Sequence, residues 1–561
     1  MDLDHPYLKS QLIAYIGNKR SLLPFLAELF RKLEEEHSIT RFLDPFAGSG
    51  SVSRLAKFLG YEVRSNDWEP YTEIINGCHI GIDKRDTAPL FHRFGGIESA
   101  FAFFQRPPGT GGNEERLEPY ISRYYAPKDT DSADYRTERL FYTQENGLFI
   151  DRVRERIETE YPGWDLPDGD RKEKLLLVAS LIYQAATHAN TSGVFKAFHK
   201  GFGGHGRDAL RRITAPMKLL LPVLYDGRGN CTVSACDAEE FLSGYTADLC
   251  YIDPPYNQHQ YGSNYHMLNT IAKWDKPVYP LARGKDGRLL NKGGIRTDWT
   301  ETRSDFCYRD RAPEAFRRLL DAVDARFIVV SYNTEGIICF DELVDLLAAG
   351  GNVELFSNEY ITFRGGRQSI NRRTHNAELL LVCTRGKKRD PASRERIDRF
   401  KEETKLKSLL RAGFHPGRIR RAFTVIGDQV SLFGGKGPYL QTDYLVYFHT
   451  PVHSGIFTGL SSAELAGLRG SLEACMFTDR KEECDVLLEL LRNGITGKMT
   501  VKIAKKLLQA LKKIAHKKYW RDYEEVFENT RRLAREKIDI FWDFSAELDR
   551  LEEVANLRFN G

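Results

Sequence analysis

The chain has 561 residues, of which 41% are hydrophobic and 29% charged. This ordinary globular composition excludes a wholly disordered or fibrous protein, and the length predicts about two to four domains. The net charge is only +4, so global charge neither requires nor excludes a nucleic-acid partner. No apolar run approaches the roughly 20 residues of a membrane span, and the polar amino terminus lacks a secretory signal.

The cysteines indicate the redox environment. There are nine of them, scattered along the chain without any Cys-x-x-Cys pair. An odd number without paired spacing is typical of reduced thiols, and it argues against a zinc site. We therefore expect a cytoplasmic protein without a metal centre or a membrane partner.

Short apolar runs predict buried parallel strands at residues 41–44, 249–253, 327–331 and 378–383. Helical patterns at residues 21–36 and 341–349 alternate with these runs, which predicts an α/β fold with a doubly wound sheet. Ligands bind at the carboxyl ends of the strands in such sheets. Functional residues are therefore expected just after Leu43, just after Ile252 and near Ser331.

The first strand leads into a glycine-containing loop. It ends at Asp44, and a small-residue turn with Gly48 and Gly50 follows before a predicted helix at residues 52–59. Glycines allow close approach of a ligand to the backbone, and a helix amino terminus offers free N–H groups. This loop contains neither Gly-x-Gly-x-x-Gly nor Gly-Lys-Ser/Thr, which disfavours a dinucleotide or P-loop nucleotide site here. Asp67 ends the next predicted strand at a spacing that suits bonds from ribose hydroxyls. A lone Asp there is more often a helix cap, but the glycine loop upstream favours the ribose contact.

A sharper motif follows the strand at residues 249–253. Asp253-Pro254-Pro255-Tyr256 cannot extend the sheet, because proline lacks an N–H group. The prolines hold the Asp253 carboxylate and the Pro254 carbonyl rigidly outward, where they can accept both hydrogens of a planar amino group. Tyr256 can stack on the ring that bears this group. The alternative is a proline turn with a surface Asp and a core Tyr.

Together these motifs resemble the S-adenosylmethionine-dependent DNA adenine-N(6) methyltransferases of the Dam-like class. Residues 15–23 resemble the amino-terminal cofactor motif, residues 44–51 motif I, residues 66–67 motif II and residues 253–256 the catalytic motif IV. Residues 141–146, 190–195 and 261–270 resemble the branch that occurs with type IIS restriction–modification systems. The resemblance covers roughly residues 7–385.

The resemblance implies S-adenosylmethionine as cofactor and assigns residue roles. The catalytic residues would be Asp253, Pro254, Pro255 and Tyr256. The cofactor-binding residues would be Tyr15, Gly17, Lys19, Asp44, Phe46, Gly48, Gly50, Asp67 and Asp237. Two of these have simpler explanations: Lys19 beside Arg20 suits a solvated surface, and Asp237 suits a cap for a helix at residues 238–242.

The resemblance also implies how the chain is organised. We expect a Rossmann-like doubly wound methyltransferase sheet from residues 1–75 and 216–385, with a target-recognition insertion at residues 76–215. A linker at 386–407, which also suits an exposed helix, would precede a mainly helical carboxyl-terminal domain at 408–561. The insertion is rich in aromatic and basic residues, among them Tyr125, Arg139, Phe141 and Tyr142. Its candidate DNA contacts are Lys200, Arg207 and Arg211; for any single residue, a solvated surface position is the safer interpretation.

The carboxyl-terminal region contains a basic stretch that matches no family motif. Nine basic and no acidic residues lie between Lys498 and Arg521, and apolar residues recur there at helical spacing. One face of such a helix can pack while lysines line the other. Lys505 and Lys512 are therefore candidates for phosphate contacts, with a solvated helix face as the alternative.

The predicted function is site-specific methylation of the adenine amino group in duplex DNA by base flipping, in a restriction–modification context. The partners would be double-stranded DNA and a cognate restriction endonuclease. No cysteine follows a proline, which disfavours a cytosine methylase with a thiolate nucleophile. An RNA adenine methyltransferase and a non-catalytic DNA-binding subunit with a degenerate cofactor site remain the alternatives.

Overall fold

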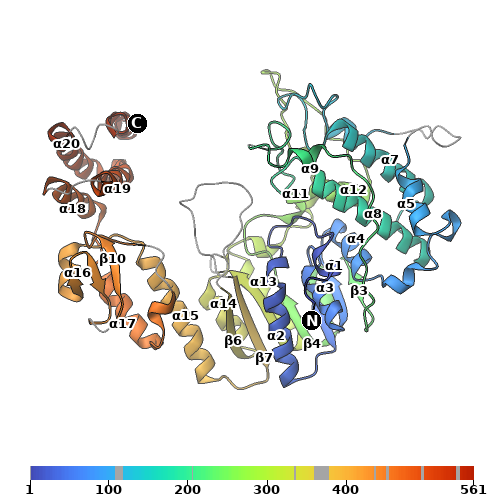
Figure 1. Cartoon of the computed structure of the whole chain (residues 1–561), viewed down its shortest axis with the longest axis horizontal. Helices are drawn as coiled ribbons and strands as arrows, with labels where there is room; N and C mark the ends of the chain where they lie inside the picture. The colour runs from blue at the N-terminus through green and yellow to red at the C-terminus, as the bar shows by residue number, and fades with distance from the viewer. Residues whose placement is uncertain are drawn as a thin grey trace. The chain divides into compact units, whose positions relative to one another are not determined.

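A seven-stranded sheet forms the centre of the amino-terminal unit of the chain (Figure 1). The computed structural model describes residues 2–107, 118–204, 206–333, 336–358, 378–434, 437–449, 454–493, 498–537 and 544–560. The chain forms two compact units, residues 1–390 and 391–561. No helix in the described ranges is long and apolar enough to cross a membrane.

The strands follow the order β3-β2-β1-β4-β5-β7-β6. They are β1 (Arg41–Asp44), β2 (Glu62–Asn66), β3 (Thr232–Ser234), β4 (Thr246–Ile252), β5 (Asp324–Asn333), β6 (Gly351–Asn358) and β7 (Glu378–Arg385). The predicted runs at 41–44, 249–253 and 327–331 are confirmed as parallel strands. The run at 378–383 is also a strand, but the prediction that it is parallel was wrong: β7 pairs antiparallel with both β5 and β6. A strand buried on both faces has the same apolar pattern in either direction, so the pattern could not give its orientation.

Helices cover both faces of the sheet. The short α1 (Pro6–Lys9), α2 (Leu23–Glu36) and α3 (Ser51–Leu59) pack on one face against Leu249 and Tyr251 of β4. On the other face, α14 (Phe340–Ala348) contacts β6 and β7. Next to it, α13 (Ala312–Ala322) contacts α14, and α10 (Ala238–Leu242) contacts α13. Alternate residues of the central strands thus face different helical layers, as a doubly wound sheet requires.

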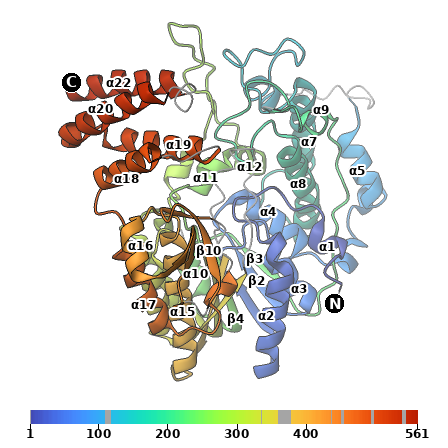
Figure 2. The same ribbon diagram turned by 60° about the vertical axis from the view of Figure 1, so that its left-hand side comes forward.

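A second, mostly helical core lies beside the sheet (Figures 1 and 2). Its helices are α4 (Pro70–His79), α5 (Ile97–Gln105), α6 (Ile121–Tyr124), α7 (Gln144–Glu160), α8 (Asp168–His188) and α9 (Leu210–Thr214). Between β4 and β5, α11 (Tyr261–Asn264) precedes α12 (His266–Lys273), and α12 contacts α4 and α8. The helical region is therefore built from two separated stretches of sequence rather than from residues 76–215 alone.

Several residues expected at a recognition surface lie inside this core. Tyr125, Phe141 and Tyr142 are fully buried, and Arg139 is 1% exposed. The Arg139 guanidinium donates hydrogen bonds to four backbone carbonyls, which satisfies it without an external partner. Composition alone could not separate buried aromatic and basic residues from exposed ones.

The carboxyl-terminal unit has two cores. In the first, α15 (Pro391–Leu409) packs on α17 (Ser462–Glu473), with α16 (Pro416–Ala422) and a four-stranded antiparallel sheet alongside. The strands of that sheet are β8 (Thr424–Ile426), β9 (Gln429–Ser431), β10 (Tyr439–Asp443) and β11 (Tyr447–Phe448). The second core contains α18 (Arg480–Arg492), α19 (Lys498–Ile514), α20 (Trp520–Glu536) and α22 (Ser545–Asn560).

Two expectations about this unit can be compared with the structure. Residues 386–407 contain most of α15, so this stretch is a helix, the alternative to a linker; Leu406 packs into the first core, Ile397 is also buried, and charged pairs such as Arg394–Asp398 lie on the exposed side. The amphipathic helix in the basic stretch is confirmed. Ile503 and Leu511 of α19 are fully buried, whereas Lys505 and Lys512 are exposed.

Candidate active site

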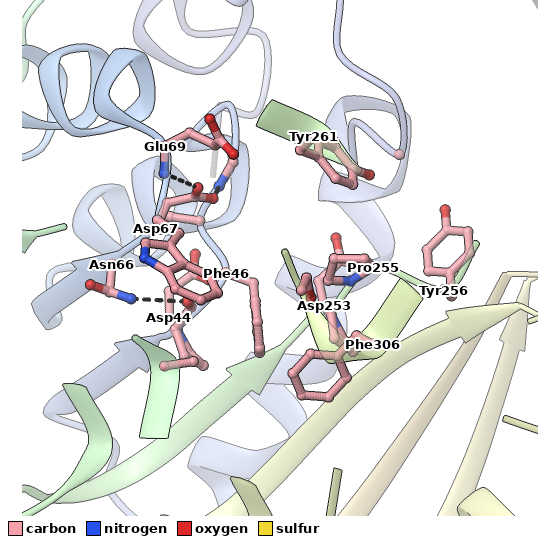
Figure 3. Close-up of a pocket in the computed structure, with 18 of the residues that line it drawn as sticks. Asp44, Phe46, Asn66, Asp67, Glu69, Asp253, Pro255, Tyr256, Tyr261 and Phe306 are labelled. Atoms are coloured by element: carbon pink, nitrogen blue, oxygen red, sulfur yellow. Dashed lines mark hydrogen bonds between the residues drawn. The ribbon is translucent and has the colours of Figure 1, made fainter. Parts of the chain in front are cut away.

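A pocket lies at the carboxyl ends of β1, β2 and β4, the edge of the sheet where the sequence predicted chemistry (Figure 3). The parallel pairing of β1 with β2 and with β4 brings these strand ends together. Twelve of the thirteen predicted catalytic and cofactor-binding residues line the pocket. They are Tyr15, Gly17, Lys19, Asp44, Phe46, Gly48, Asp67, Asp237, Asp253, Pro254, Pro255 and Tyr256.

The thirteenth residue, Gly50, does not itself line the pocket, but it belongs to the glycine loop that does. It caps the amino terminus of α3 with a left-handed backbone (φ 76°), and an added Cβ would lie 2.2 Å from Asn76 Oδ1. Gly48 is also left-handed (φ 51°), and its Cβ would lie 2.8 Å from Tyr15 Cε1. Both positions therefore require glycine for conformation and for space.

The loop after β1 is tied to the end of β2. Asp67 Oδ2 accepts a hydrogen bond from Gly48 N (2.8 Å), and its Oδ1 accepts one from Glu69 N (3.1 Å). The Asn66 side chain donates to Cys236 O (3.1 Å) and accepts from Cys236 N (3.1 Å). These bonds hold the loops after β1, β2 and β3 as one rigid wall.

Asp237 follows this wall, and its carboxylate caps α10 by accepting a hydrogen bond from Glu239 N (2.8 Å). It also lines the pocket. The cap and the predicted cofactor contact are therefore compatible, since one carboxylate has lone pairs for both.

Asp44 is a buried carboxyl group at the base of the pocket. It is 1% exposed, and its Oδ2 accepts a hydrogen bond from Ser53 Oγ (2.6 Å). Burial raises the pKa of Asp44 to about 7; the Ser53 bond opposes this shift, and the negative charge of Asp253 adds to it. Asp44 Oδ1 has no hydrogen-bond partner among the described residues. A cationic group in the pocket would satisfy this oxygen and favour the ionised form.

The segment around Tyr15 forms the roof of the pocket. The Tyr15 ring stacks on that of Tyr265, with centroids 4.9 Å apart. The Tyr265 hydroxyl accepts a hydrogen bond from Ile16 N (2.8 Å), and the Tyr261 hydroxyl donates one to Ile16 O (3.2 Å). Tyr261 of α11 and Tyr265, which lies between α11 and α12, thereby fix the amino-terminal segment over the sheet edge.

Lys19 joins this roof to the motif after β4. Its Nζ lies 3.1 Å from Asp253 Oδ1 and 5.3 Å from the centroid of the Tyr256 ring. Lys19 is only 4% exposed and Asp253 16%, so the ion pair is largely shielded from water. In Figure 3, Asp44 and Asp67 lie on one side of Asp253, and Tyr256 lies on the other. The position of Lys19 at this contact rules out a solvated surface role.

Tyr256 is held by the end of β5. Its ring meets Tyr332 edge-on at 5.7 Å, and its carbonyl accepts a hydrogen bond from Ile337 N (3.1 Å). Neither Ser331 nor Tyr332 is among the residues that line the pocket, so the expectation of chemistry near Ser331 stays a prediction; Tyr332 contacts the pocket residue Tyr256 from behind.

Sequence reasoning missed Glu69. This carboxyl group lines the pocket, is 8% exposed, and accepts a hydrogen bond from Asn269 Nδ2 (2.6 Å). Burial raises the pKa of Glu69 to about 7, opposed by the Asn269 bond. Glu69 follows Asp67 by two positions, and no local pattern distinguishes it from a surface residue.

The loop at residues 302–306 was also missed. Phe306 meets Phe46 edge-on at 5.4 Å, so the two rings form one apolar side of the pocket (Figure 3). The Gln260 side chain accepts a hydrogen bond from Ser304 N (2.9 Å) and donates one to Ser304 O (3.2 Å). This clamp holds the loop against the segment that follows Tyr256.

The candidate contacts outside the pocket are solvent-accessible. Lys200, Arg207 and Arg211 are exposed on the loop before α9 and on α9 itself. The buried Asn190 shapes that loop, because its side chain donates to His199 O (3.3 Å) and accepts from Gly203 N (3.3 Å). Within the described residues, no group of three or more His, Cys, Asp or Glu side chains could hold a metal ion.

A mostly parallel sheet, with a glycine loop after β1 and acidic residues at the next strand ends, defines an α/β protein with a nucleotide-type cofactor pocket. The family model for D12 class N6 adenine-specific DNA methyltransferases matches residues 15–306. The chain belongs to this family. The resemblance found in the sequence motifs is thereby confirmed.

Individual relatives are modification enzymes. The chain is 30% identical to the type II methyltransferase M.NlaIII of Neisseria lactamica, over 65% of this chain and 95% of that protein. It is 29% identical to the modification methylase LlaI of Lactococcus lactis subsp. lactis, over 64% of this chain and 52% of LlaI. It is 28% identical to the type II methyltransferase M.FokI of Planomicrobium okeanokoites, over 61% of this chain and 48% of M.FokI. The match thus spans about half the length of LlaI and of M.FokI.

The close contact between Gly48 and Tyr15 leads to a prediction. Gly48→Ala should lower the free energy of unfolding by about 1–3 kcal/mol through backbone strain, and it should abolish measurable S-adenosylmethionine binding because Tyr15 must move. Gly244→Ala is the matched control, since Gly244 has a similar positive φ (82°) with open space around it. Denaturant titration and calorimetric titration with the cofactor measure both effects. Wild-type cofactor affinity in Gly48→Ala would contradict the placement of the cofactor.

Proposed function

We propose that the protein transfers the methyl group of S-adenosylmethionine to the exocyclic amino nitrogen of adenine at a specific site in duplex DNA. The observation that carries this proposal is the Lys19–Asp253 pair at the carboxyl end of β4, beside the glycine loop and Asp44. Membership of the adenine-specific D12 family supports the base and the acceptor atom.

The pocket fits S-adenosylmethionine. The buried Asp44 carboxyl, with one oxygen that has no hydrogen-bond partner in the described part of the chain, suits a cationic cofactor group, and Asp67 retains lone pairs for ribose hydroxyls. Gly48, Tyr15 and the Phe46–Phe306 pair would enclose the remainder. When bound, the cofactor supplies an electrophilic methyl group on a sulfonium centre.

Asp253 and Pro254 would prepare the adenine nitrogen for attack. The lone pair of this nitrogen is delocalised into the ring, so the amino group is a poor nucleophile. Hydrogen bonds from its two N–H groups to the Asp253 carboxylate and the Pro254 carbonyl would favour a pyramidal nitrogen with a localised lone pair. Lys19 would hold the Asp253 carboxylate in place for this task.

Tyr256 would stack on the adenine ring, and Tyr332 keeps its plane fixed. Asp253 is only 16% exposed within the pocket, so a base inside an intact helix would not reach it. The base would have to leave the duplex, at a cost of a few kcal/mol, and stacking would offset about 1–3 kcal/mol of that.

We assign target recognition to the exposed loops of the helical region. Lys200, Arg207 and Arg211 are exposed there, and the buried Asn190 fixes the loop before α9. Buried Arg139 and the buried aromatic residues would act indirectly, by holding these loops. The relatives are named as type II methyltransferases and modification methylases, which supports a restriction–modification role with a cognate endonuclease as partner.

The function is tested by incubating purified protein with labelled S-adenosylmethionine and mixed-sequence DNA, followed by digestion to nucleosides. We expect label in N6-methyladenine, at one recurring sequence when the product is read by methylation-sensitive sequencing. Label found only in cytosine, or only when structured RNA replaces DNA, would refute the assignment.

Asp253→Asn should lower the methylation rate by at least about 10²–10³-fold, the usual cost of losing one charge-positioning group in an active site. Cofactor affinity should change little, because the proposed partner of Asp253 is the adenine amino group. Asp324→Asn is the control, since Asp324 begins β5 at the opposite edge of the sheet. Single-turnover methylation and cofactor titration make the measurement; near-normal turnover would reject Asp253 as the catalytic residue.

Lys200→Ala combined with Arg207→Ala should weaken DNA binding or shift the methylated sequence, without altering cofactor affinity. Both side chains are exposed and lie outside the pocket. Fluorescence anisotropy with duplex DNA and sequencing of the methylated product provide the readouts. Parental affinity together with an unchanged methylation pattern would remove these residues from the recognition surface.

We further propose that α19 contacts DNA phosphates without reading sequence. Lys502 pairs with Asp443, and Lys506 lies 4.7 Å from the Tyr447 ring centroid, so both are engaged within the unit. Lys505, Lys512 and Lys513 are exposed. Replacing these three with Gln should flatten the slope of log affinity against log salt by up to about 2.7, at about 0.9 for each lost phosphate contact, and leave the methylated sequence unchanged. Parental affinity and slope would mean that α19 is only structural or contacts another protein.

A further inference from the structure

The connection between β4 and β5 carries an arm at residues 276–294, whose basic residues were not among the candidate DNA contacts of the sequence. The middle of the arm forms a short hairpin. Gly284 N donates a hydrogen bond to Arg288 O (2.8 Å), and Leu290 N donates one to Ala282 O (3.0 Å). Figures 1 and 2 show this yellow-green segment reaching out past α12.

The base of the arm is fixed by buried residues of the helical region. Arg139 donates hydrogen bonds to Tyr279 O (3.3 Å) on the outgoing leg and to Asn291 O (3.0 Å) on the returning leg. The Tyr125 hydroxyl donates to Gly294 O (2.8 Å). The arm has no core of its own, so these bonds set its direction.

The hairpin presents positive charge to solvent. Arg283, Lys285, Arg288 and Lys292 are all exposed, and Asp286 is the one acidic residue between them. Asp286 Oδ2 lies 3.7 Å from Arg288 Nε. The four cationic side chains of the hairpin therefore outnumber its single carboxylate. Such a cluster repels itself unless an anionic partner lies against it.

Two neighbouring segments extend this charge. Leu289 N donates a hydrogen bond to Arg136 O (2.9 Å), which brings the hairpin beside Tyr135. Arg136 and Lys200 lie 5.6 and 5.8 Å from the Tyr135 ring centroid. The pKa of the Tyr135 hydroxyl is lowered by Arg136, with smaller effects of Lys200 and Arg288. One positive surface therefore spans three separate parts of the chain.

The connection that carries this surface also lines the active-site pocket, on either side of the arm. The chain lines the pocket at Gln260 and Tyr261 before the arm, and lines it again at Arg303 and Phe306 after the arm. A duplex that delivers a base to Asp253 would have its backbone near the same connection. The charge on the arm complements phosphates spaced along such a backbone.

We propose that the arm at residues 276–294 is a phosphate-binding clamp for the substrate duplex, with Arg283, Lys285, Arg288 and Lys292 as its contacts. The proposal rests on the proposed DNA-methylating function. The arm binds the backbone and not base edges, so it contributes affinity and salt dependence but no sequence preference. Arg139 and Tyr125 are positioning residues for the arm.

The test is the variant with Arg283→Gln, Lys285→Gln, Arg288→Gln and Lys292→Gln. Its DNA affinity at about 0.15 M salt should fall by about tenfold or more, and the slope of log affinity against log salt should flatten by up to about 3.6. Cofactor affinity, thermal unfolding and the methylated sequence should match those of the parent, because these side chains are exposed and outside the pocket. Fluorescence anisotropy with duplex DNA over a salt series gives the affinities.

The matched control is Arg41→Gln, Arg326→Gln, Lys387→Gln and Lys388→Gln. It removes the same charge from exposed residues at the opposite edge of the sheet. Its slope should equal that of the parent. Parental affinity and slope in the arm variant, or an equal loss in the control, would overturn the proposal. If the parent binds DNA through the arm but never methylates it, the proposed clamp is supported and the proposed catalytic function is wrong. If the parent methylates DNA and the arm variant binds DNA with parental affinity, the catalytic function is supported and the clamp is wrong.

Discussion

The active site depends on the burial of several carboxyl groups at one edge of a parallel sheet. Asp44, Asp67, Glu69 and Asp253 all line one pocket, and Lys19 forms an ion pair there with Asp253. Carboxylates removed from water and placed near one another disfavour ionisation, which is why the pKa values of Asp44 and Glu69 rise to about 7. The pocket is thus suited to a cationic cofactor, whose charge would offset this cost.

The same arrangement explains why the walls of the pocket must be rigid. Asp67 is fixed by two backbone N–H groups, and Asn66 joins its strand end to Cys236. The segment around Tyr15 is held by Tyr261 of α11 and by Tyr265, which stacks on Tyr15 and lies between α11 and α12. Alignment of two bound groups can lower the barrier of a group transfer by up to about 7–11 kcal/mol in well-oriented cases. Loose walls would forfeit that gain.

The helical region connects the pocket to the proposed DNA-binding surface through buried polar residues. Arg139 and Asn190 make their hydrogen bonds to backbone groups of loops whose tips are exposed and basic. A buried polar side chain that is fully bonded specifies one loop geometry, whereas an exposed one does not. Buried residues thus determine where the exposed cations lie.

The sequence alone determined much of this protein. The loop from Asp44 to Gly50 and the Asp253–Tyr256 motif are local, so their backbone requirements could be read directly from residue order and then placed at the strand ends. The sequence could not give the direction of β7, since a buried strand has the same apolar pattern in either direction. Nor could it show that Tyr125 and Arg139 are buried inside the helical core rather than exposed on its surface. The Lys19–Asp253 pair, the Glu69–Asn269 bond and the anchored arm were decided by the tertiary structure. Each joins residues far apart in the chain, and only packing of the sheet against the helical region brings them into contact.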